Sequence, residues 1–434
     1  MSTSAARKRK PAAPPLEYSL LLTATLCLLA FGAVMVFSAS SARSLLNSGG
    51  NGFYYLERTV IFGAIGLLVM RVASVRGVAA AKPMTPLILV GSLFLLFAVL
   101  LPGVGTTVNG AQRWIGGGFV QFQPSELAKI AIVLYGAHLL SAEPKRVRTL
   151  AGLGPYLLMV GLSVLLIAKE PDLGTAIVVS SSVCCVLFLA GVKPRTLAPV
   201  AAAIAFVAVV MIAIHPYQEA RLTGFLHPNS DTSGAGFQAK QATIAIGSGG
   251  LTGVGLGESV QKASYLPEAH TDMIAAVIGE ELGLVGMFVL VGLFGIFGYA
   301  GLRAAHRARD RFSKLLAAGL TSLILAQAAL NLFAVLGLAP LTGVPLPFVS
   351  YGGTSLVITL AAAGLILNVA RRPAQASSRT GSGRGTAARP ARLRVVEGGN
   401  TRRKRAASGT SRDSGRRHGG TRRTGDRRRR RASG

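Results

Sequence analysis

The stretch SLLLTATLCLLAFGAVMVFSAS, residues 19–40, contains no charged residue and is 22 residues long. A helix needs about 20 apolar residues to cross a hydrocarbon core of about 30 Å. The run is also longer than the apolar region of a secretory signal peptide, which spans about 7 to 15 residues. It therefore predicts a retained membrane span.

Further apolar runs of similar length follow along the chain. They cover residues 57–73, 85–102, 124–142, 151–168, 173–191, 196–214, 272–301, 313–337 and 347–370. Half of all residues are hydrophobic and only 15% are charged, which is typical of a protein with many membrane spans. The sequence thus predicts an all-α polytopic membrane protein of about ten transmembrane helices, with no separate soluble domain.

Basic residues lie in every second connection between these expected spans. They are Arg71, Arg76, Lys82, Lys145, Arg146, Arg148, Lys193, Arg195, Arg303, Arg307, Arg309, Arg311 and Lys314. Because cytoplasmic loops carry the excess of Lys and Arg, this pattern predicts that both termini are cytoplasmic. The connection 102–123 and the large loop 215–271, between helices 7 and 8, are then extracytoplasmic.

The formal net charge of +29 comes mostly from the two ends of the chain. Residues 371–434 hold 21 Lys and Arg against three acids, whereas residues 18–370 hold 21 against 13. The composition predicts disordered basic cytoplasmic tails at 1–17 and 371–434, around a membrane domain at 18–370. Beside membrane spans, we expect such tails to bind anionic lipid headgroups, and we expect no nucleic-acid partner.

The stretch LPEAHTDMIAAVIGEELG, residues 266–283, concentrates titratable groups where the eighth span begins. These groups are Glu268, His270, Asp272, Glu280 and Glu281. One interpretation is that Asp272 only caps the helix, because Asp is a favoured N-cap residue. A charge at the centre of a membrane helix costs about 2.5 to 3.5 kcal/mol on insertion scales, however. Several acids in one place therefore favour a functional site near the outer surface.

Two other expected spans begin or end with charged residues. In QPSELAK, Glu126 and Lys129 lie three apart and share one helix face, so they can form an ion pair. In KEPDLGT, residues 169–175, Asp172 follows a Pro-broken junction. Each motif could belong to a functional site. The alternative for the first is an ion pair that only eases membrane insertion, and the alternative for the second is an exposed turn.

Four cations lie in the connections predicted to be extracytoplasmic: Arg113, Arg221, Lys240 and Lys262. Together with Asp272 they place phosphate-pairing groups around a carboxylate, although scattered loop charges are usually only solvated. The glycines of PFVSYGGTS, residues 347–355, indicate a broken helix or close helix packing. The glycines of GGLTGVGLG, residues 249–257, lack the Lys and Ser/Thr of a phosphate loop, so no nucleotide site is predicted.

Six motifs in this order resemble the SEDS family of bacterial cell-wall glycosyltransferases. They are NGAQRWI, QPSELAK, EPDLGT, YQEARLTGFLHP, GLGESVQKASYLPEAHTDMIAAVIGEELGLVG and PLPFVSYGGTS. The resemblance covers about residues 18–370 and is closer to the division branch of the family than to its elongation branch. It implies polymerisation of lipid II, a disaccharide-peptide on undecaprenyl pyrophosphate, at the outer membrane face of a dividing bacterium. Flipping of lipid II across the membrane, the elongation role and a non-catalytic scaffold role are the alternatives.

The resemblance also implies roles for individual residues. Asp272 matches the essential carboxylate and is expected to be the catalytic base. The expected substrate-binding residues are Glu126, Lys129, Asp172, Arg221, Lys262, Glu268 and His270. We further expect a divalent cation, Mg²⁺ or Mn²⁺, with no assigned ligands, and no nucleotide. The expected partners are a class B penicillin-binding transpeptidase and other division proteins.

Overall fold

The computed structural model describes residues 14–47, 52–108, 111–118, 120–227, 234–264, 266 and 268–371. The first helix begins at Leu16 and the last ends at Arg371. The tails expected at 1–17 and 371–434 lie outside the described residues, apart from residues 14–17 and Arg371.

Within the described residues, nine helices are long and apolar enough to cross a membrane. They are α1 (Leu16–Asn47), α2 (Tyr54–Val99), α3 (Pro124–Ala142), α4 (Leu150–Lys169), α5 (Leu173–Ala190), α6 (Pro194–Ile214), α10 (Ile274–His306), α11 (Arg311–Val335) and α12 (Gly353–Arg371). The bounds of α3 to α6 and α11 lie within two residues of the expected runs, whereas α1 ends seven residues after residue 40 and α10 ends five residues after residue 301. The helix α12 begins six residues later than expected, because residues 347–352 form an irregular segment.

The helix α2 contains two of the expected spans. Its 46 residues correspond to about 69 Å, which is about twice the thickness of a hydrocarbon core. Near its start, Arg58 donates a hydrogen bond to the carbonyl of Gly118, in the hairpin that follows its other end. Both ends therefore lie on the same side, and Pro83 and Pro86 lie between them, where proline bends a helix. With α2 counted as two passes, the helices supply the ten predicted passes.

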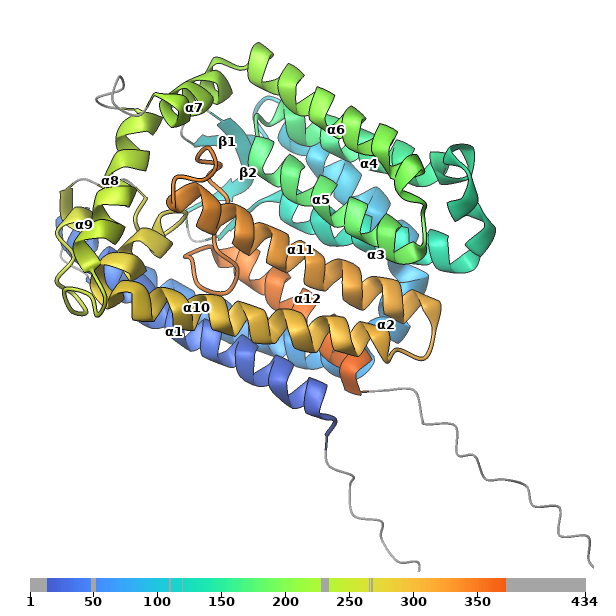
Figure 1. Cartoon of the computed structure of the whole chain (residues 1–434), viewed down its shortest axis with the longest axis horizontal. Coiled ribbons are helices and arrows are strands. Elements are labelled where there is room, and N and C mark those ends of the chain that lie inside the picture. The colour runs from blue at the N-terminus through green and yellow to red at the C-terminus, as the bar shows by residue number, and fades with distance from the viewer. Residues whose placement is uncertain are drawn as a thin grey trace, which may run out of the picture. The chain divides into compact units, whose positions relative to one another are not determined.

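The two long connections predicted to be extracytoplasmic are folded. The first forms a small antiparallel sheet in the order β1–β2–β3, which the expectation of an all-α chain did not include. Its strands are β1 (Gly105–Val108), β2 (Ala111–Gly117) and β3 (Val120–Phe122). The second contains three helices, α7 (Pro216–Leu226), α8 (Ala235–Gly249) and α9 (Gln261–Ser264). Figure 1 shows α7, α8 and β1 near the same end of the bundle, which we name the loop end.

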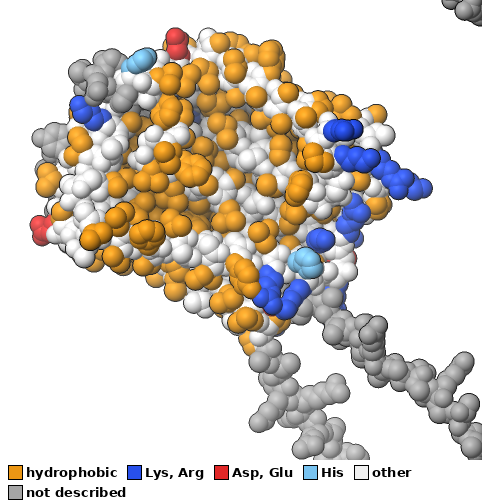
Figure 2. All heavy atoms as spheres, viewed as in Figure 1, with side chains coloured by type: hydrophobic (Ala, Val, Ile, Leu, Met, Phe, Trp, Pro, Cys, Tyr) orange, Lys and Arg blue, Asp and Glu red, His pale blue; other side chains and the backbone are white. Residues whose placement is uncertain are grey.

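The opposite end of the bundle is basic. It includes the 3₁₀ helix η1 (Pro144–Arg148) and the connection from α10 to α11. There Glu17 at the start of α1 accepts ion pairs from Arg303 at 3.0 Å and Arg307 at 2.6 Å, both at the end of α10. In Figure 2, Lys and Arg side chains gather along this end, whereas hydrophobic side chains cover the flank between the ends. This pattern is what the positive-inside rule predicts for a membrane protein.

The core of the bundle consists of α3, α5, α11, α12 and the first part of α10, whose side chains are mostly buried. By contrast, α6 lies along the edge in Figure 1, and apolar residues such as Phe206 and Val209 are exposed on it. Exposed apolar side chains on a spanning helix are compatible with contact to lipid. The central helices, in turn, carry the polar residues that position the site.

Candidate functional site

Asp272 lies at the loop end, between α9 and α10, and its side chain is half-buried. It does not cap α10, because the N-cap position is occupied by Met273, with no side-chain capping bond. Instead, the hydroxyl of Thr271 lies within hydrogen-bond distance of Glu268 Oε2, at 3.2 Å, and of Asp272 Oδ1, at 3.3 Å. Glu268 has a φ of 59°, a strained conformation for a residue other than glycine. Two carboxylates are therefore held side by side.

The surroundings of Asp272 shift its acidity. Loss of hydration raises the pKa of this carboxyl to about 6, the positive charge of Arg221 opposes the shift, and the negative charge of Glu268 adds to it. The pKa stays below neutral pH, so the carboxylate form dominates at pH 7. A carboxylate with a raised pKa is a stronger base than an ordinary aspartate.

Arg221 projects from α7 and is fixed by two contacts. Its Nη1 donates to the carbonyl of Leu341 at 3.1 Å, and its guanidinium lies 4.5 Å from the centre of the Tyr217 ring. An arginine stacked on an aromatic ring keeps donors available for a planar or phosphate-like anion. Its positive charge lowers the pKa of Asp272, so the structure places Arg221 within electrostatic range of that carboxylate.

A buried polar chain joins α3, α11 and the segment before α12. Lys129 Nζ lies 2.8 Å from Glu126 Oε1 and donates to Gln327 Oε1 at 2.7 Å. Gln327 in turn donates to the carbonyl of Pro345 at 2.9 Å. The predicted pair of Glu126 and Lys129 is thus confirmed, and both side chains are almost fully buried.

One turn further along α11, Asn331 reaches Asp272 itself. Its amide nitrogen donates to the main-chain carbonyl of Asp272 and to that of Val344, both at 2.8 Å. Gln327 and Asn331 were missed in the sequence. Their signal was polarity within an otherwise apolar span, which is uncommon and often functional.

Asp172 connects two helix starts. Its Oδ1 accepts from the main-chain nitrogen of Thr175 at 3.0 Å, as an N-cap of α5, and its Oδ2 accepts from Gln123 at 3.2 Å. Gln123 is the residue that precedes α3, so the carboxylate ties α3 to α5. Asp172 is buried, and this role in positioning both helices accounts for its charge.

Glu170 lies two residues before Asp172 and is fully buried. Neither of its carboxyl oxygens has a hydrogen-bond partner among the described residues. Loss of hydration, together with the nearby charge of Asp172, raises the pKa of this carboxyl to about 9. Arg113 donates to the main-chain carbonyls of Glu170 and Pro171, so it attaches the sheet to this junction. Arg113 and Glu170 are 57 residues apart, so no local pattern in the sequence indicates these contacts.

His270 lies in an aromatic group close to Asp272. Its ring centre is 4.3 Å from that of Tyr55 and 5.6 Å from that of Tyr351, and its carbonyl accepts from the main-chain nitrogen of Tyr351 at 2.9 Å. Arg58, one turn after Tyr55, stacks on the Tyr54 ring at 4.3 Å. The group thus places aromatic rings against His270 and a cation beside Tyr54, and only His270 among these residues was predicted.

Lys262 belongs to a different group. Its ammonium lies 2.6 Å from Glu281 Oε1 and donates to the carbonyl of Gly257 at 2.8 Å, and its side chain is buried. Lys240 is exposed on α8. Of the four loop cations singled out in the sequence, the structure therefore brings only Arg221 to Asp272.

The glycine-rich loop of residues 249–257 packs against a break in the helix α10. At Gly283 the chain has φ 62° and ψ −159°, so α10 is broken there. The carbonyls of Glu280 and Glu281 accept from Val254 and Gly255, each at 3.0 Å. A side chain on Gly253 would place its Cβ 2.1 Å from the carbonyl of Glu281, so only glycine fits. The loop inserts into the break and satisfies its backbone groups.

In the part of the chain that the structure describes, no group of three or more His, Cys, Asp or Glu residues could hold a metal ion. The adjacent carboxylates of Glu268 and Asp272 are nevertheless hard oxygen ligands. Mg²⁺ is often held by one or two carboxylates together with substrate phosphates. The residues present therefore fit a cation that arrives with a phosphorylated substrate.

The family model described as a cell cycle protein, FtsW/RodA/SpoVE, matches residues 18–375. The chain belongs to this family. It is 39% identical over 353 residues to the probable peptidoglycan glycosyltransferase FtsW of Geobacter sulfurreducens, covering 81% of this chain and 94% of that one. Its identity to the FtsW of Thioalkalivibrio sulfidiphilus is 43% over 356 residues, covering 81% and 88%.

A chain in a solved structure has a similar fold. It comes from work on the structural coordination of polymerization and crosslinking by a peptidoglycan synthase complex. The TM-score is 0.68 at 30% identity, and the match covers 82% of this chain and 98% of that chain. The membership and the fold inferred from the motifs are thereby confirmed.

Proposed function

We propose that this protein is a peptidoglycan glycosyltransferase of cell division, which polymerises lipid II into glycan strands at the outer face of the cytoplasmic membrane. The observation that carries the proposal is the pair of Asp272 and Arg221 at the loop end, a base with a raised pKa beside a cation. The names of the FtsW relatives support the same activity. We also propose a septal location, which the resemblance to the division branch of the family supports.

In the proposed reaction, Asp272 takes the proton of the acceptor sugar's 4-hydroxyl group. The hydroxyl oxygen forms a bond to the anomeric carbon of the donor, and the bond from that carbon to the phosphate oxygen breaks. The pyrophosphate leaves with the electron pair. Because the donor linkage is α and the product linkage is β, one inverting displacement suffices, without a covalent enzyme intermediate.

The departing pyrophosphate needs positive charge near it. Arg221 supplies a fixed guanidinium, and we propose that Arg58 adds a second one from the start of α2. A divalent cation held by Glu268 would supply further neutralisation of the phosphates and would leave Asp272 free to take the proton. Lys129 is buried against Glu126 and Gln327, and we propose that it acts through the polar chain beneath the site.

An apolar cavity supports a proposal for where the lipid chain of the substrate binds. An apolar cavity of about 450 Å³ lies between α4, α5 and α6, and its lining includes Leu157, Ile177 and Ile204. The lining extends to Leu173, the residue that follows Asp172 at the loop end. We propose that part of the polyprenyl chain occupies this cavity while the pyrophosphate lies toward Arg221.

The test is polymerisation by the purified full-length protein in proteoliposomes that contain labelled lipid II. We expect glycan strands to form, and more strongly when a class B transpeptidase is added as the proposed partner. Movement of labelled lipid II between leaflets without any polymer, with and without the partner, would instead support the flippase alternative.

A further inference from the structure

The first part of α10 is a separate short helix held at both of its ends. Residues 274–282 precede the break at Gly283 and span about 13 Å. Every residue from Met273 to Glu281 is buried. At the amino end, Asn331 holds the carbonyl of Asp272, and Tyr351 holds that of His270. Asp272 therefore lies at the amino end of a short, buried helix.

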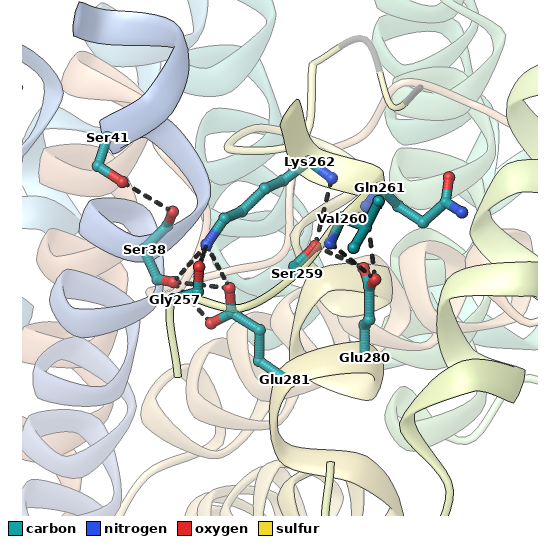
Figure 3. A network of polar contacts seen from close by, with 9 residues as sticks. All are labelled: Ser38, Ser41, Gly257, Ser259, Val260, Gln261, Lys262, Glu280 and Glu281. Carbon is teal, nitrogen blue, oxygen red and sulfur yellow. Dashed lines mark hydrogen bonds and ion pairs between the residues drawn. The ribbon is translucent and has the colours of Figure 1, made fainter. Parts of the chain in front are cut away.

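The other end of this short helix carries the buried charges, which Figure 3 shows from close by. Lys262 Nζ contacts Glu281 Oε1 at 2.6 Å and donates to Ser38 Oγ at 3.2 Å. The hydroxyl of Ser38, on α1, lies 2.7 Å and 2.6 Å from the two Glu281 oxygens. One cluster thus ties α1, α9 and the short helix together.

Glu280, the neighbouring residue, binds the three residues that precede Lys262. Its Oε1 accepts from the main-chain nitrogens of Val260 and Gln261 at 3.0 and 3.4 Å, and its Oε2 accepts from the hydroxyl of Ser259. The side chains of the two adjacent glutamates therefore hold residues 259–262, which follow the loop that fills the break. Backbone bonds from Leu284 and Val285 to Gly250 and Leu251 complete the attachment.

We propose that Lys262, Glu281 and Ser38 form a latch that positions Asp272 by fixing the far end of the short helix. Lys262 and Glu281 are thus positioning residues, and they act through the helix rather than by touching substrate. The geometry supports this because a continuous α10 would need no such clamp. A break at Gly283 otherwise allows the segment before it to move relative to the segment after it. The proposal rests on the function proposed for Asp272.

The latch is tested with the full-length double variant Lys262→Met/Glu281→Leu. Replacing both members of a buried ion pair by apolar residues of similar size usually preserves the fold. Packing is kept, but the directed bonds to Ser38 and Gly257 are lost. We therefore expect the melting temperature to stay close to that of the wild type, kcat with lipid II to fall by about tenfold, and KM to change by less than about twofold.

A merely structural pair predicts a different result, because a variant that folds normally would then have normal kcat. Wild-type kcat in the folded double variant would overturn the latch. Ser38→Ala is the second variant, and it removes only the hydroxyl that bridges Lys262 and Glu281. We expect it to lower kcat by a smaller factor with unchanged KM, and wild-type kcat in this variant would also count against the proposal.

A matched control lies at the carboxyl end of α10, beyond the break. There Arg303 and Arg307 pair with Glu17, a buried residue on α1 that is far along the chain from Asp272. Because that pair does not hold the short helix, Glu17→Gln should leave kcat unchanged. An equal loss of kcat in Glu17→Gln would mean that any loosening of α10 impairs the enzyme, which would overturn a specific latch.

Hydrogen exchange gives a readout that does not depend on activity. In the double variant we expect amides of residues 268–282 to exchange about tenfold faster, with residues 286–306 unchanged. Unchanged exchange in 268–282 would overturn the latch even in an inactive preparation. If the wild type forms no polymer while the exchange difference is present, the proposed function fails and the latch stands.

Discussion

The side-chain amide of Asn331 donates to the main-chain carbonyl of Asp272 at 2.8 Å, which joins the middle of the bundle to the proposed catalytic residue. The same amide nitrogen holds the carbonyl of Val344 at 2.8 Å. One buried side chain on α11 thus fixes two segments of the loop end. Geometry at the reacting group affects rate strongly, since a misplacement of about 1 Å can lower it about 100-fold.

We predict that Asn331→Leu lowers kcat by at least tenfold while changing KM little, because the segment that carries Asp272 loses its anchor. The measurement is lipid II polymerisation by the purified variant. Asn368→Leu is the matched control, since Asn368 is equally buried and donates to the carbonyl of Ser74 at 2.8 Å, away from the site. Similar losses in both variants would reduce Asn331 to a general packing role.

The acidic limb of the pH profile should report Asp272. The pKa of this carboxyl in the free protein is about 6, and the base must be ionised, so kcat/KM should fall about tenfold per pH unit below pH 6 and level off above pH 7. Arg221 lowers this pKa, so Arg221→Met should move the limb to higher pH, whereas Lys240→Met, on the same loop, should not. A limb that stays in place after loss of Arg221 would contradict the electrostatic contact.

Glu126 and Lys129 allow stability to be separated from function. If they only neutralise each other, Glu126→Gln/Lys129→Met should be tolerated in every respect. We predict instead near-normal expression and melting temperature with polymerisation reduced at least tenfold, because the contact to Gln327 is lost. Lys129→Met alone should be less stable than the double variant, since it leaves Glu126 buried without its cation. Wild-type polymerisation by the double variant would return the pair to a structural role.

Glu170 should affect stability in a pH-dependent way. The pKa of its carboxyl is raised from about 4.5 to about 9, so the folded state keeps a proton that the unfolded state loses above pH 4.5. The wild type should therefore lose stability progressively from pH 4.5 to pH 9. Glu170→Gln removes this dependence, so its melting temperature should exceed that of the wild type increasingly between pH 5 and pH 8. A constant difference over that range would contradict a buried protonated carboxyl.

Much of the fold follows from local sequence. Apolar runs of about 20 residues define the passes, because only a helix satisfies its backbone in lipid. The hairpin at 105–122 was not predicted, since its glycine-rich strands carry no clear alternation of apolar residues. The bend that lets α2 cross twice was read as a loop, although Pro83 and Pro86 do lie at that place.

Only part of the candidate site could be predicted from the sequence, because many of its contacts join residues that are far apart in the chain. Glu126 and Lys129 are three residues apart on one helix, so their pairing is visible in the sequence. Lys262 and Glu281 are 19 residues apart, and Ser38 is more than 200 residues away, so the partner of Lys262 depends on tertiary packing. Gly253 was considered only as part of a phosphate loop and Gly283 lay within a predicted span, because nothing local indicates that one backbone inserts into another.

The most direct measurement is polymerisation of labelled lipid II by folded Asp272→Asn protein beside the wild type. Asn keeps the size of the side chain and removes the base, so we predict a loss of kcat of about 100-fold to 10,000-fold. The melting temperature at pH 8 should be equal or higher, since burial of the charged carboxylate is avoided. Glycan strands formed at the wild-type rate by this variant would contradict the account.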